Sequence, residues 1–363
     1  MRINPPSLPP IAGRGAPANA VSARFALPQR QADGDWLDAS ALIDGEPRKV
    51  RTEISIESPR TIIARNMSPD VGFDRSINPY RGCEHGCIYC YARPSHAYLD
   101  LSPGLDFESR ITVKPDAAAL LRKELSGRGY KVAPMAIGTN TDGYQPVERE
   151  WAITRSVIAV LAETRHPLIL TTKSDRLLRD IDLLADMARD DLVHVAISVT
   201  TLDPRIAQTL EPRAPGPAKR IAAIAALAAA NIPVHVNVSP VVPAITDHEI
   251  ERILASAAQA GATSASYINL RLPHEVAPLF RAWLDAHYPD RAAKVMAIVR
   301  DMRGGRDNDP NFATRMKGTG VWADLIRTRF KRAARIYGLD SPVPPLRCDL
   351  FKPPERDGQF ALF

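Results

Sequence analysis

Apolar residues in the central part of the chain follow two alternating patterns. Short apolar runs of about five residues, typical of buried strands, separate longer stretches in which apolar residues recur every three or four positions, as in amphipathic helices. The strands are expected at 133–138, 168–172, 194–199, 234–239 and 265–270, with one more leading into Cys83. The helices between them are expected at 116–126, 147–164, 175–188, 217–230 and 247–260.

This alternation of strand and helix predicts an α/β fold with a parallel sheet. The pattern leaves open whether the sheet stays open or curls into a barrel. In both arrangements the functional residues follow the carboxyl ends of the strands. We therefore expect a site among the polar residues that follow successive strands, which include 139–142, Lys173, Ser198, Thr200 and Arg271.

The patterning divides the chain into four segments. Residues 1–60 are rich in proline and glycine and have no sustained period, which predicts a flexible arm. Residues 61–273 form the α/β core. Residues 274–340 show only helical periodicity, at 276–286, 291–302 and 321–337, and predict a helical cap. Residues 341–363 form a second proline-rich tail.

Composition and charge narrow the class of protein. The 363 residues are 45% hydrophobic and 24% charged, as in soluble globular proteins. The sequence has neither a long apolar run nor a secretory h-region, which predicts a cytoplasmic protein without a membrane partner. The net charge is +6, and residues 271–335 contain fourteen Lys and Arg against seven Asp and Glu. This segment either binds phosphate groups or is an ordinary solvated helical surface.

Three of the four cysteines, Cys83, Cys87 and Cys90, follow one another with the spacing C-x3-C-x2-C. Three thiolates on one loop leave one position of a metal centre open. A 4Fe-4S cluster tolerates this arrangement, whereas a structural zinc ion needs a fourth protein ligand, here His85 or Cys348. A non-catalytic, zinc-stabilised nucleic-acid-binding module is therefore the alternative hypothesis, although we expect His85 to be an exposed loop residue.

The cysteine spacing, with Tyr89 directly before the last cysteine, resembles the signature of radical S-adenosylmethionine (radical SAM) enzymes. The resemblance implies a partial (β/α)6 barrel and a 4Fe-4S cluster held by the three cysteines. It also implies S-adenosylmethionine as a cofactor and an external electron donor. In such enzymes, reductive cleavage of S-adenosylmethionine gives a 5′-deoxyadenosyl radical that attacks the substrate.

Three longer segments resemble the branch of this family that includes spore photoproduct lyase and DNA-repair-photolyase-like proteins. They are INPYRGC at 77–83, TDGYQPVE at 141–148 and ISVTTLD at 197–203. This likeness and the basic segment favour a nucleic acid as substrate, with a peptide or small molecule as the alternative. Spore photoproduct lyase uses a further barrel cysteine as hydrogen donor. Because only Cys348 remains here, in the tail, we expect the reaction to differ.

The resemblance also implies which residues contact S-adenosylmethionine. The loop after the second strand would meet its amino group, and hydroxyls after the fourth would meet its ribose or carboxylate. These residues are Thr139, Asn140, Thr141, Asp142, Ser198 and Thr200. Such side chains also cap helices and satisfy turns, and for Asn237 and Ser239 we favour that structural role. Lys173 either pairs with an anionic group or ends a strand in solvent.

The last five residues, QFALF, resemble the peptide with which bacterial repair and replication proteins bind the sliding clamp. The likeness rests on Gln359, Leu362 and Phe363. Their position after a proline-rich stretch suits a peptide that docks in a partner's groove. The alternative is an apolar terminus that packs on its own domain.

Overall fold

The computed structural model describes residues 11–20, 22, 24–25 and 50–354. It has a mixed α/β architecture, as the sequence predicts, built around a seven-stranded sheet with the order β10-β9-β8-β7-β6-β3-β2. Six of these strands are parallel, and only β2 runs antiparallel to its neighbour. The strands are β2 (Ile63–Arg65), β3 (Arg75–Ile77), β6 (Met135–Ile137), β7 (Leu168–Thr172), β8 (Val193–Ser198), β9 (Val234–Val241) and β10 (Ser264–Asn269).

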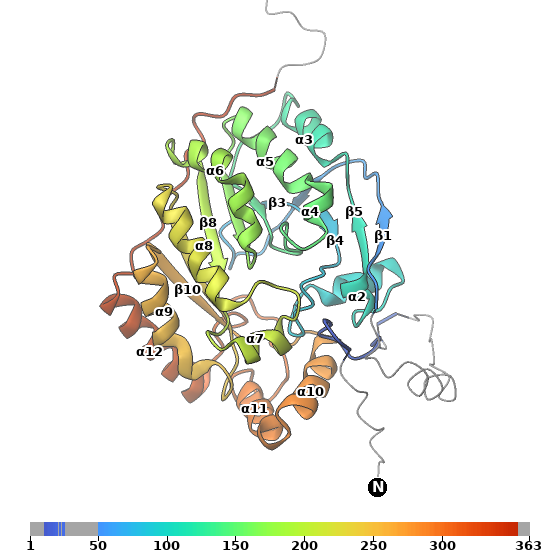
Figure 1. Ribbon diagram of the computed structural model, residues 1–363, viewed down its shortest axis with the longest axis vertical. Helices are drawn as coiled ribbons and strands as arrows, with labels where there is room; N and C mark the ends of the chain where they lie inside the picture. The colour runs from blue at the N-terminus through green and yellow to red at the C-terminus, as the bar shows by residue number, and fades with distance from the viewer. Residues whose placement is uncertain (1–10, 21, 23, 26–49, 355–363) are drawn as a thin grey trace, which may run out of the picture.

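Helices connect these strands and cover one face of the sheet, as Figure 1 shows. They are α3 (Ala117–Leu125), α4 (Glu148–Trp151), α5 (Ile153–Glu163), η2 (Asp175–Asp180), α6 (Ile181–Ala188), α7 (Pro204–Leu210), α8 (Pro217–Ala229), η3 (Asp247–Glu249) and α9 (Ile250–Gln259). Strand β9 shows how the faces differ. Val234, Val236 and Val238 are buried in the main hydrophobic core, whereas His235 and Asn237 point to the other face and are only half-buried. The helix-free face is therefore the polar one.

A small second sheet has the order β1-β5-β4 and lies beside the large one. Its strands are β1 (Glu53–Ile56), β4 (Tyr80–Arg81) and β5 (Arg110–Val113). The strand predicted to lead into Cys83 is thus two strands, because Ile77 ends β3 in the large sheet and Tyr80 begins β4 in the small one. Two elements pack near this sheet, the 3-10 helix η1 (Arg93–Leu99) and α2 (Asp106–Ser109).

Most strand predictions agree with the structure to within two residues, but three predicted helices are divided, and those at 175–188 and 247–260 begin with the 3-10 helices η2 and η3. The expected helix 147–164 is two helices, α4 and α5, because Ala152 between them has a left-handed backbone with φ of 51°. The break lets the Glu148 carboxylate turn inward, where the Tyr80 hydroxyl and the Thr154 backbone N–H donate to it. These contacts join the helix pair to the small sheet.

The described part of the N-terminal segment differs from the flexible arm that its composition predicts. The backbone N–H groups of Gly15 and Ala16 each donate to Glu108 at 2.8 Å. The Arg14 side chain is buried and donates to the Glu108 backbone carbonyl. A buried carboxylate without these donors would be costly, so this stretch is part of the packed structure.

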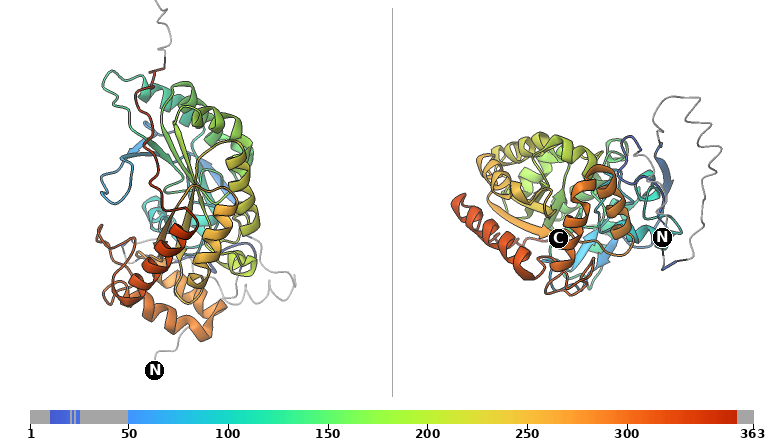
Figure 2. Two further views of the ribbon diagram at one scale, coloured as in Figure 1. Left: turned by 90° about the vertical axis from the view of Figure 1, so that its left-hand side faces the viewer. Right: turned by 90° about the horizontal axis from the view of Figure 1, so that it is seen from below.

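Three helices follow the sheet, α10 (Val276–His287), α11 (Pro289–Asp301) and α12 (Gly320–Ile336). Both α10 and α11 lie beyond the carboxyl ends of the strands, whereas α12 packs against α9 and β10 (Figure 2). A second hydrophobic cluster joins α10 and α11 to Cys87, Ile88 and Tyr89. The two helices therefore support the cysteine loop from outside.

The tail runs to the opposite end of the sheet. The backbone N–H of Arg347 donates to Asp191 O, and that of Lys352 donates to Thr164 O. Both acceptors lie just before strands begin, at the amino end of the sheet. The predicted clamp-binding residues Gln359, Leu362 and Phe363 lie outside the described residues.

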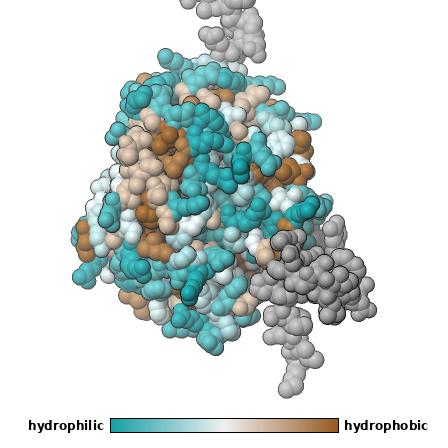
Figure 3. Space-filling view, in the orientation of Figure 1, coloured by the Kyte–Doolittle hydropathy of each residue, from teal (hydrophilic) through white to brown (hydrophobic). Residues whose placement is uncertain are grey.

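The surface of one face and the lengths of the helices can be described briefly. Figure 3 shows a mostly hydrophilic face with apolar residues over the alanine-rich α8 and near the edge strand β1, where Ile54 and Ile56 are exposed. In the described ranges no helix is long and apolar enough to span a lipid bilayer.

Candidate active site

The three clustered cysteines lie on the loop between β4 and η1, and two glycines give this loop its shape. Gly82 and Gly86 have φ of 74° and 68°, a left-handed conformation that favours glycine. A Cβ on Gly86 would lie 2.7 Å from Glu108 Oε2, so the close approach also requires glycine. Turn hydrogen bonds from Gly86 N to Cys83 O and from Cys90 N to Cys87 O complete the loop.

A fully buried ion pair between Arg93 and Glu108 holds the cysteine loop in place. Arg93 donates to Glu108 Oε1 at 2.5 Å, and both side chains are completely buried. The same guanidinium donates to Cys87 O at 2.9 Å and to Gly86 O at 3.1 Å. Arg93 therefore binds two carbonyls of the cysteine loop while its own charge is neutralised. Its sequence position, three residues after Cys90, gave no signal of this role.

All three cysteines line one cavity of about 530 Å³ at the carboxyl ends of the parallel strands. Cys83 and Cys87 are 7% exposed, and Cys90 is half-buried. Burial raises the pKa of the Cys87 thiol to about 12, although the nearby Lys173 ammonium opposes this shift. Burial also raises the pKa of Cys83. Binding of a metal centre by these cysteines requires the thiolate form.

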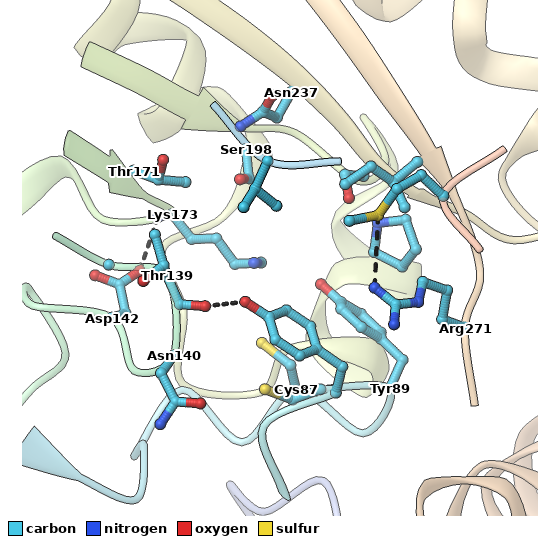
Figure 4. A pocket seen from close by; sticks show the side chains of 18 of the residues that line it. Cys87, Tyr89, Thr139, Asn140, Asp142, Thr171, Lys173, Ser198, Asn237 and Arg271 are labelled. Carbon is cyan, nitrogen blue, oxygen red and sulfur yellow. Dashed lines mark hydrogen bonds between the residues drawn. The ribbon is translucent and has the colours of Figure 1, made fainter. Parts of the chain in front are cut away.

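The predicted cofactor residues divide into two groups. Four of them line the cavity with the cysteines, as Figure 4 shows: Thr139, Asn140, Asp142 and Ser198. The other two do not line it. Thr141 Oγ1 donates to Tyr80 O at 3.1 Å, and Thr200 Oγ1 donates to Glu211 Oε1 at 2.8 Å. These contacts turn the two hydroxyls away from the cavity. Asn237 and Ser239, for which a structural role was favoured, do line the cavity.

Asp142 is held by several donors. It accepts hydrogen bonds from Thr172 Oγ1 at 2.7 Å and from the backbone N–H groups of Lys173 and Tyr144 at 2.9 Å. His85 Nδ1 lies 3.4 Å from its Oδ2. Burial acts to raise the pKa of Asp142, but His85 and these hydrogen bonds outweigh burial and hold the pKa well below its usual range. The carboxylate thus organises the site.

The expectation for His85 is wrong, because the side chain is 2% exposed rather than solvated. It is buried because its ring lies against the Asp142 carboxylate at the floor of the cavity. This contact joins the cysteine loop to the loop that follows β6. No local sequence pattern indicates it, since the two residues are far apart along the chain.

Sequence reasoning also missed a buried hydrogen-bond network around Glu211, near Cys87. The Tyr89 hydroxyl and the Arg220 guanidinium both donate to the Glu211 carboxylate. Burial acts to raise the pKa of Glu211, but the positive charges of Arg220 and Lys173 outweigh it and lower the pKa to about 2. Lys173 Nζ lies 5.9 Å from the centroid of the Tyr89 ring and lines the cavity. Lys173 thus does not end its strand in open solvent, because its half-buried side chain lines the cavity beside Tyr89.

Cys348 is remote from this site. It lies in the tail segment that packs at the amino end of the sheet, next to Arg347, whose N–H donates to Asp191 O. The cavity lies at the carboxyl end. Cys348 therefore does not join the cluster cysteines, either as a fourth ligand or as a hydrogen donor.

Comparison with known proteins identifies the family. The model of the Radical SAM superfamily matches residues 77–257. An uncharacterized protein of Mycobacterium tuberculosis is 38% identical over 230 residues, which are 63% of this chain and 68% of the relative. The chain belongs to the radical SAM superfamily. A second relative, an uncharacterized protein of Methanocaldococcus jannaschii, is 27% identical over 216 residues, or 59% of this chain and 76% of the relative.

The fold of this radical SAM protein is similar to that of spore photoproduct lyase. One mutant of the lyase aligns with a TM-score of 0.55 and 16% identity, covering 84% of this chain and 92% of the lyase. The lyase complexed with dinucleoside spore photoproduct aligns with a TM-score of 0.54 and 16% identity, covering 81% and 85%. At this identity the likeness concerns the fold. Membership of the superfamily implies binding of S-adenosylmethionine and of an iron–sulfur cluster.

Proposed function

We propose that this protein is a radical SAM enzyme in which Cys83, Cys87 and Cys90 hold a 4Fe-4S cluster. When bound, the cluster supplies the electron that cleaves S-adenosylmethionine to methionine and a 5′-deoxyadenosyl radical, which acts on the substrate. The observation that carries the proposal is that the three cysteines share one cavity with the polar residues that follow the parallel strands. A partial (β/α)6 barrel, open on the polar face of the sheet, is part of this proposal.

The cysteine geometry fits a cluster better than a zinc ion. In the described ranges, no three His, Cys, Asp or Glu side chains are close enough together to hold a single metal ion. A tetrahedral zinc site needs such convergence. In a 4Fe-4S cluster each cysteine bonds a different iron, so the thiols surround a group of atoms rather than a point. Among the described residues His85 does not converge with the cysteines on one point, and Cys348 is remote, so the fourth ligand that the zinc alternative requires has no support.

The residues that line the cavity have different roles in this proposal: binding the cofactor, fixing the loops and stabilising a thiolate. Thr139, Asn140 and Ser198 present polar groups to S-adenosylmethionine. Asp142 acts mainly by fixing the loops around it, since four groups already surround its carboxylate. Lys173 places a positive charge beside Cys87, which favours the thiolate form that a metal centre requires.

The substrate is proposed to be a nucleic acid, with DNA-repair-like chemistry. The basic segment 271–335 and the fold shared with spore photoproduct lyase support this proposal. The chemistry would differ from that of the spore lesion, because among the described residues no cysteine other than the three on the loop reaches the cavity. An external electron donor is required as a partner, and the sliding clamp stays a prediction from the tail sequence.

The test is anaerobic reconstitution with iron and sulfide, followed by addition of dithionite and S-adenosylmethionine. The expected result is a brown protein that forms 5′-deoxyadenosine, detected by chromatography with mass detection. Cys87→Ala should form none, whereas the matched control Cys348→Ala should behave as wild type because Cys348 lies at the other end of the sheet. A colourless protein that co-purifies with zinc would refute the proposal.

A further inference from the structure

One wall of the cavity carries an arginine without a carboxylate partner. Arg271 follows β10, and its Nη1 lies 3.5 Å from Met316 Sδ, a weak acceptor. Its guanidinium carbon lies 5.8 Å from the centroid of the Tyr91 ring. Among the described residues, the buried Nε has no hydrogen-bond partner. A charged group held in this way is costly unless a ligand completes its hydrogen bonds.

Two fully buried arginines near the cavity are neutralised. Arg93 pairs with Glu108, and Arg220 pairs with Glu211. Of the two arginines that line the cavity in the described part of the chain, Arg315 is held by Asp70, at 2.5 Å and 2.6 Å, whereas Arg271 is not held by a carboxylate. Arg271 lines the cavity on the side opposite Asp142 in Figure 4, so its guanidinium lies at the edge of the space that a substrate would enter.

A second buried cation increases the positive potential of this wall. Arg303 is 1% exposed and donates only to backbone carbonyls, which include Leu270 O at 2.8 Å and Arg315 O at 2.7 Å. Burial and the neighbouring charge of Arg271 lower its pKa to about 10. Arg303 ties the loop that bears Arg315 to the end of β10. It thus positions the wall and adds a charge that no carboxylate of the described residues hydrogen-bonds.

Each of the two arginines that line the cavity lies beside an exposed aromatic ring, of which Tyr91 also lines the cavity and Phe312 is the neighbour of Arg315. Tyr91, under the Arg271 guanidinium, is 51% exposed, and Phe312 is 45% exposed with the Arg315 guanidinium 4.5 Å from its centroid. Alternating guanidinium groups and exposed rings suit an unstacked nucleotide, whose base stacks on a ring while its phosphate meets a cation. A peptide carboxylate would use the cation but leave both rings uncovered.

We propose that Arg271 binds a phosphate group of a nucleotide unit in the substrate, with Tyr91 and Phe312 as stacking surfaces for adjacent bases. The inference rests on the proposed function, because it names the part of the substrate that this cavity holds. Tyr91 directly follows Cys90, so a nucleotide at this wall lies next to the cysteine loop. The phosphate belongs either to a free mononucleotide or to a single strand, and the experiment separates the two.

The experiment measures binding of fluorescein-labelled oligothymidylate to the anaerobically reconstituted full chain by fluorescence anisotropy. Arg271→Gln should weaken binding by roughly tenfold or more, because a hydrogen bond to a charged group is lost. The dependence of log K on log salt should become shallower by about one unit, the signature of one lost phosphate contact. Arg271→Lys should keep most of the affinity, since the charge stays.

The matched control is Arg189→Gln, which removes the same charge from a side chain that is 75% exposed, beyond the end of α6 and away from the cavity. It should leave the affinity and the salt dependence unchanged. Thermal melting of each variant separates a loss of folding from a loss of binding. Thymidine monophosphate and an oligomer with neutral methylphosphonate linkages serve as competitors: the first should compete only if a single nucleotide suffices, and the second should not compete.

Several outcomes would overturn the inference. Equal oligothymidylate affinity in wild type and Arg271→Gln would do so, as would full competition by the neutral oligomer. Binding of an acidic peptide that depends on Arg271, without oligothymidylate binding, would assign the wall to carboxylates. Weaker S-adenosylmethionine binding in Arg271→Gln with unchanged oligothymidylate affinity would assign Arg271 to the cofactor. Failure of the proposed function is visible separately, as a wild-type protein that forms no 5′-deoxyadenosine.

Discussion

The two walls of the cavity differ in whether their buried charged side chains have hydrogen-bonding partners within the protein. On the wall of the cysteine loop, Asp142 and Glu211 each have several donors, and Arg220 is paired. On the wall at the end of β10, the contacts of the Arg271 guanidinium within the described part of the chain are to the Met316 sulfur and the Tyr91 ring, and none is to a carboxylate. The charged groups on the wall of the cysteine loop contribute to the stability of the fold, because their partners belong to the protein itself. The charge of Arg271, by contrast, gains hydrogen-bonding partners only when a ligand binds.

The largest expected effect comes from breaking a pair on the first wall. Arg220→Met leaves the Glu211 carboxylate buried beside the Tyr89 hydroxyl without its cation, and should lower the free energy of unfolding by about 3–5 kcal/mol. Urea unfolding measures this change. The exposed control Arg189→Met should change the free energy by less than about 0.5 kcal/mol. Equal, small effects in both variants would remove the distinction between the walls.

The second effect concerns acid stability. The pKa of Glu211 is lowered from 4.5 to about 2, so its contribution to stability is complete above about pH 4.5 and is lost as the pH falls toward 2. Relative to Glu211→Gln, wild type should therefore lose up to about 3 kcal/mol of unfolding free energy over this range. Unfolding measured at several pH values for both proteins tests this. Parallel pH profiles would show that Glu211 is not held ionised by its partners.

A smaller effect is expected from one donor to Asp142. Thr172 Oγ1 donates to Asp142 and accepts from the Ser174 N–H, so Thr172→Val should lower the free energy of unfolding by about 2 kcal/mol. Thr171→Val is the matched control, because Thr171 lines the cavity and makes no side-chain hydrogen bond to a described residue. Differential scanning calorimetry should show a clear decrease in Tm for the first variant only.

The smallest effect is expected on the second wall. Arg271→Gln removes a cation near the Tyr91 ring, worth about 0.5–1 kcal/mol, but it also removes a poorly satisfied buried charge. We expect the free energy of unfolding to change by less than about 1 kcal/mol in either direction. A loss of several kcal/mol in urea unfolding would show that Arg271 is a structural residue like Arg220.

The sequence by itself predicted the strands and the cysteine loop. Strand alternation is a local property, since residues two apart share a face, so β7 and β9 begin where expected. Glycines 82 and 86 and the spacing of the cysteines specify a tight loop in the same local way. The rule that parallel strands bring their carboxyl ends together correctly placed Thr139, Asn140, Asp142 and Ser198 with the cysteines in one cavity.

Only the tertiary structure decided which polar residues face the cavity and which charges are paired. Thr141 and Thr200 turn away from it, because the loops after β6 and β8 follow contacts with Tyr80 and Glu211. The pairs Tyr89–Glu211 and Asp70–Arg315 join residues 122 and 245 positions apart. No local pattern encodes such pairs, because they depend on the order in which the strands assemble and on which loops that order brings together.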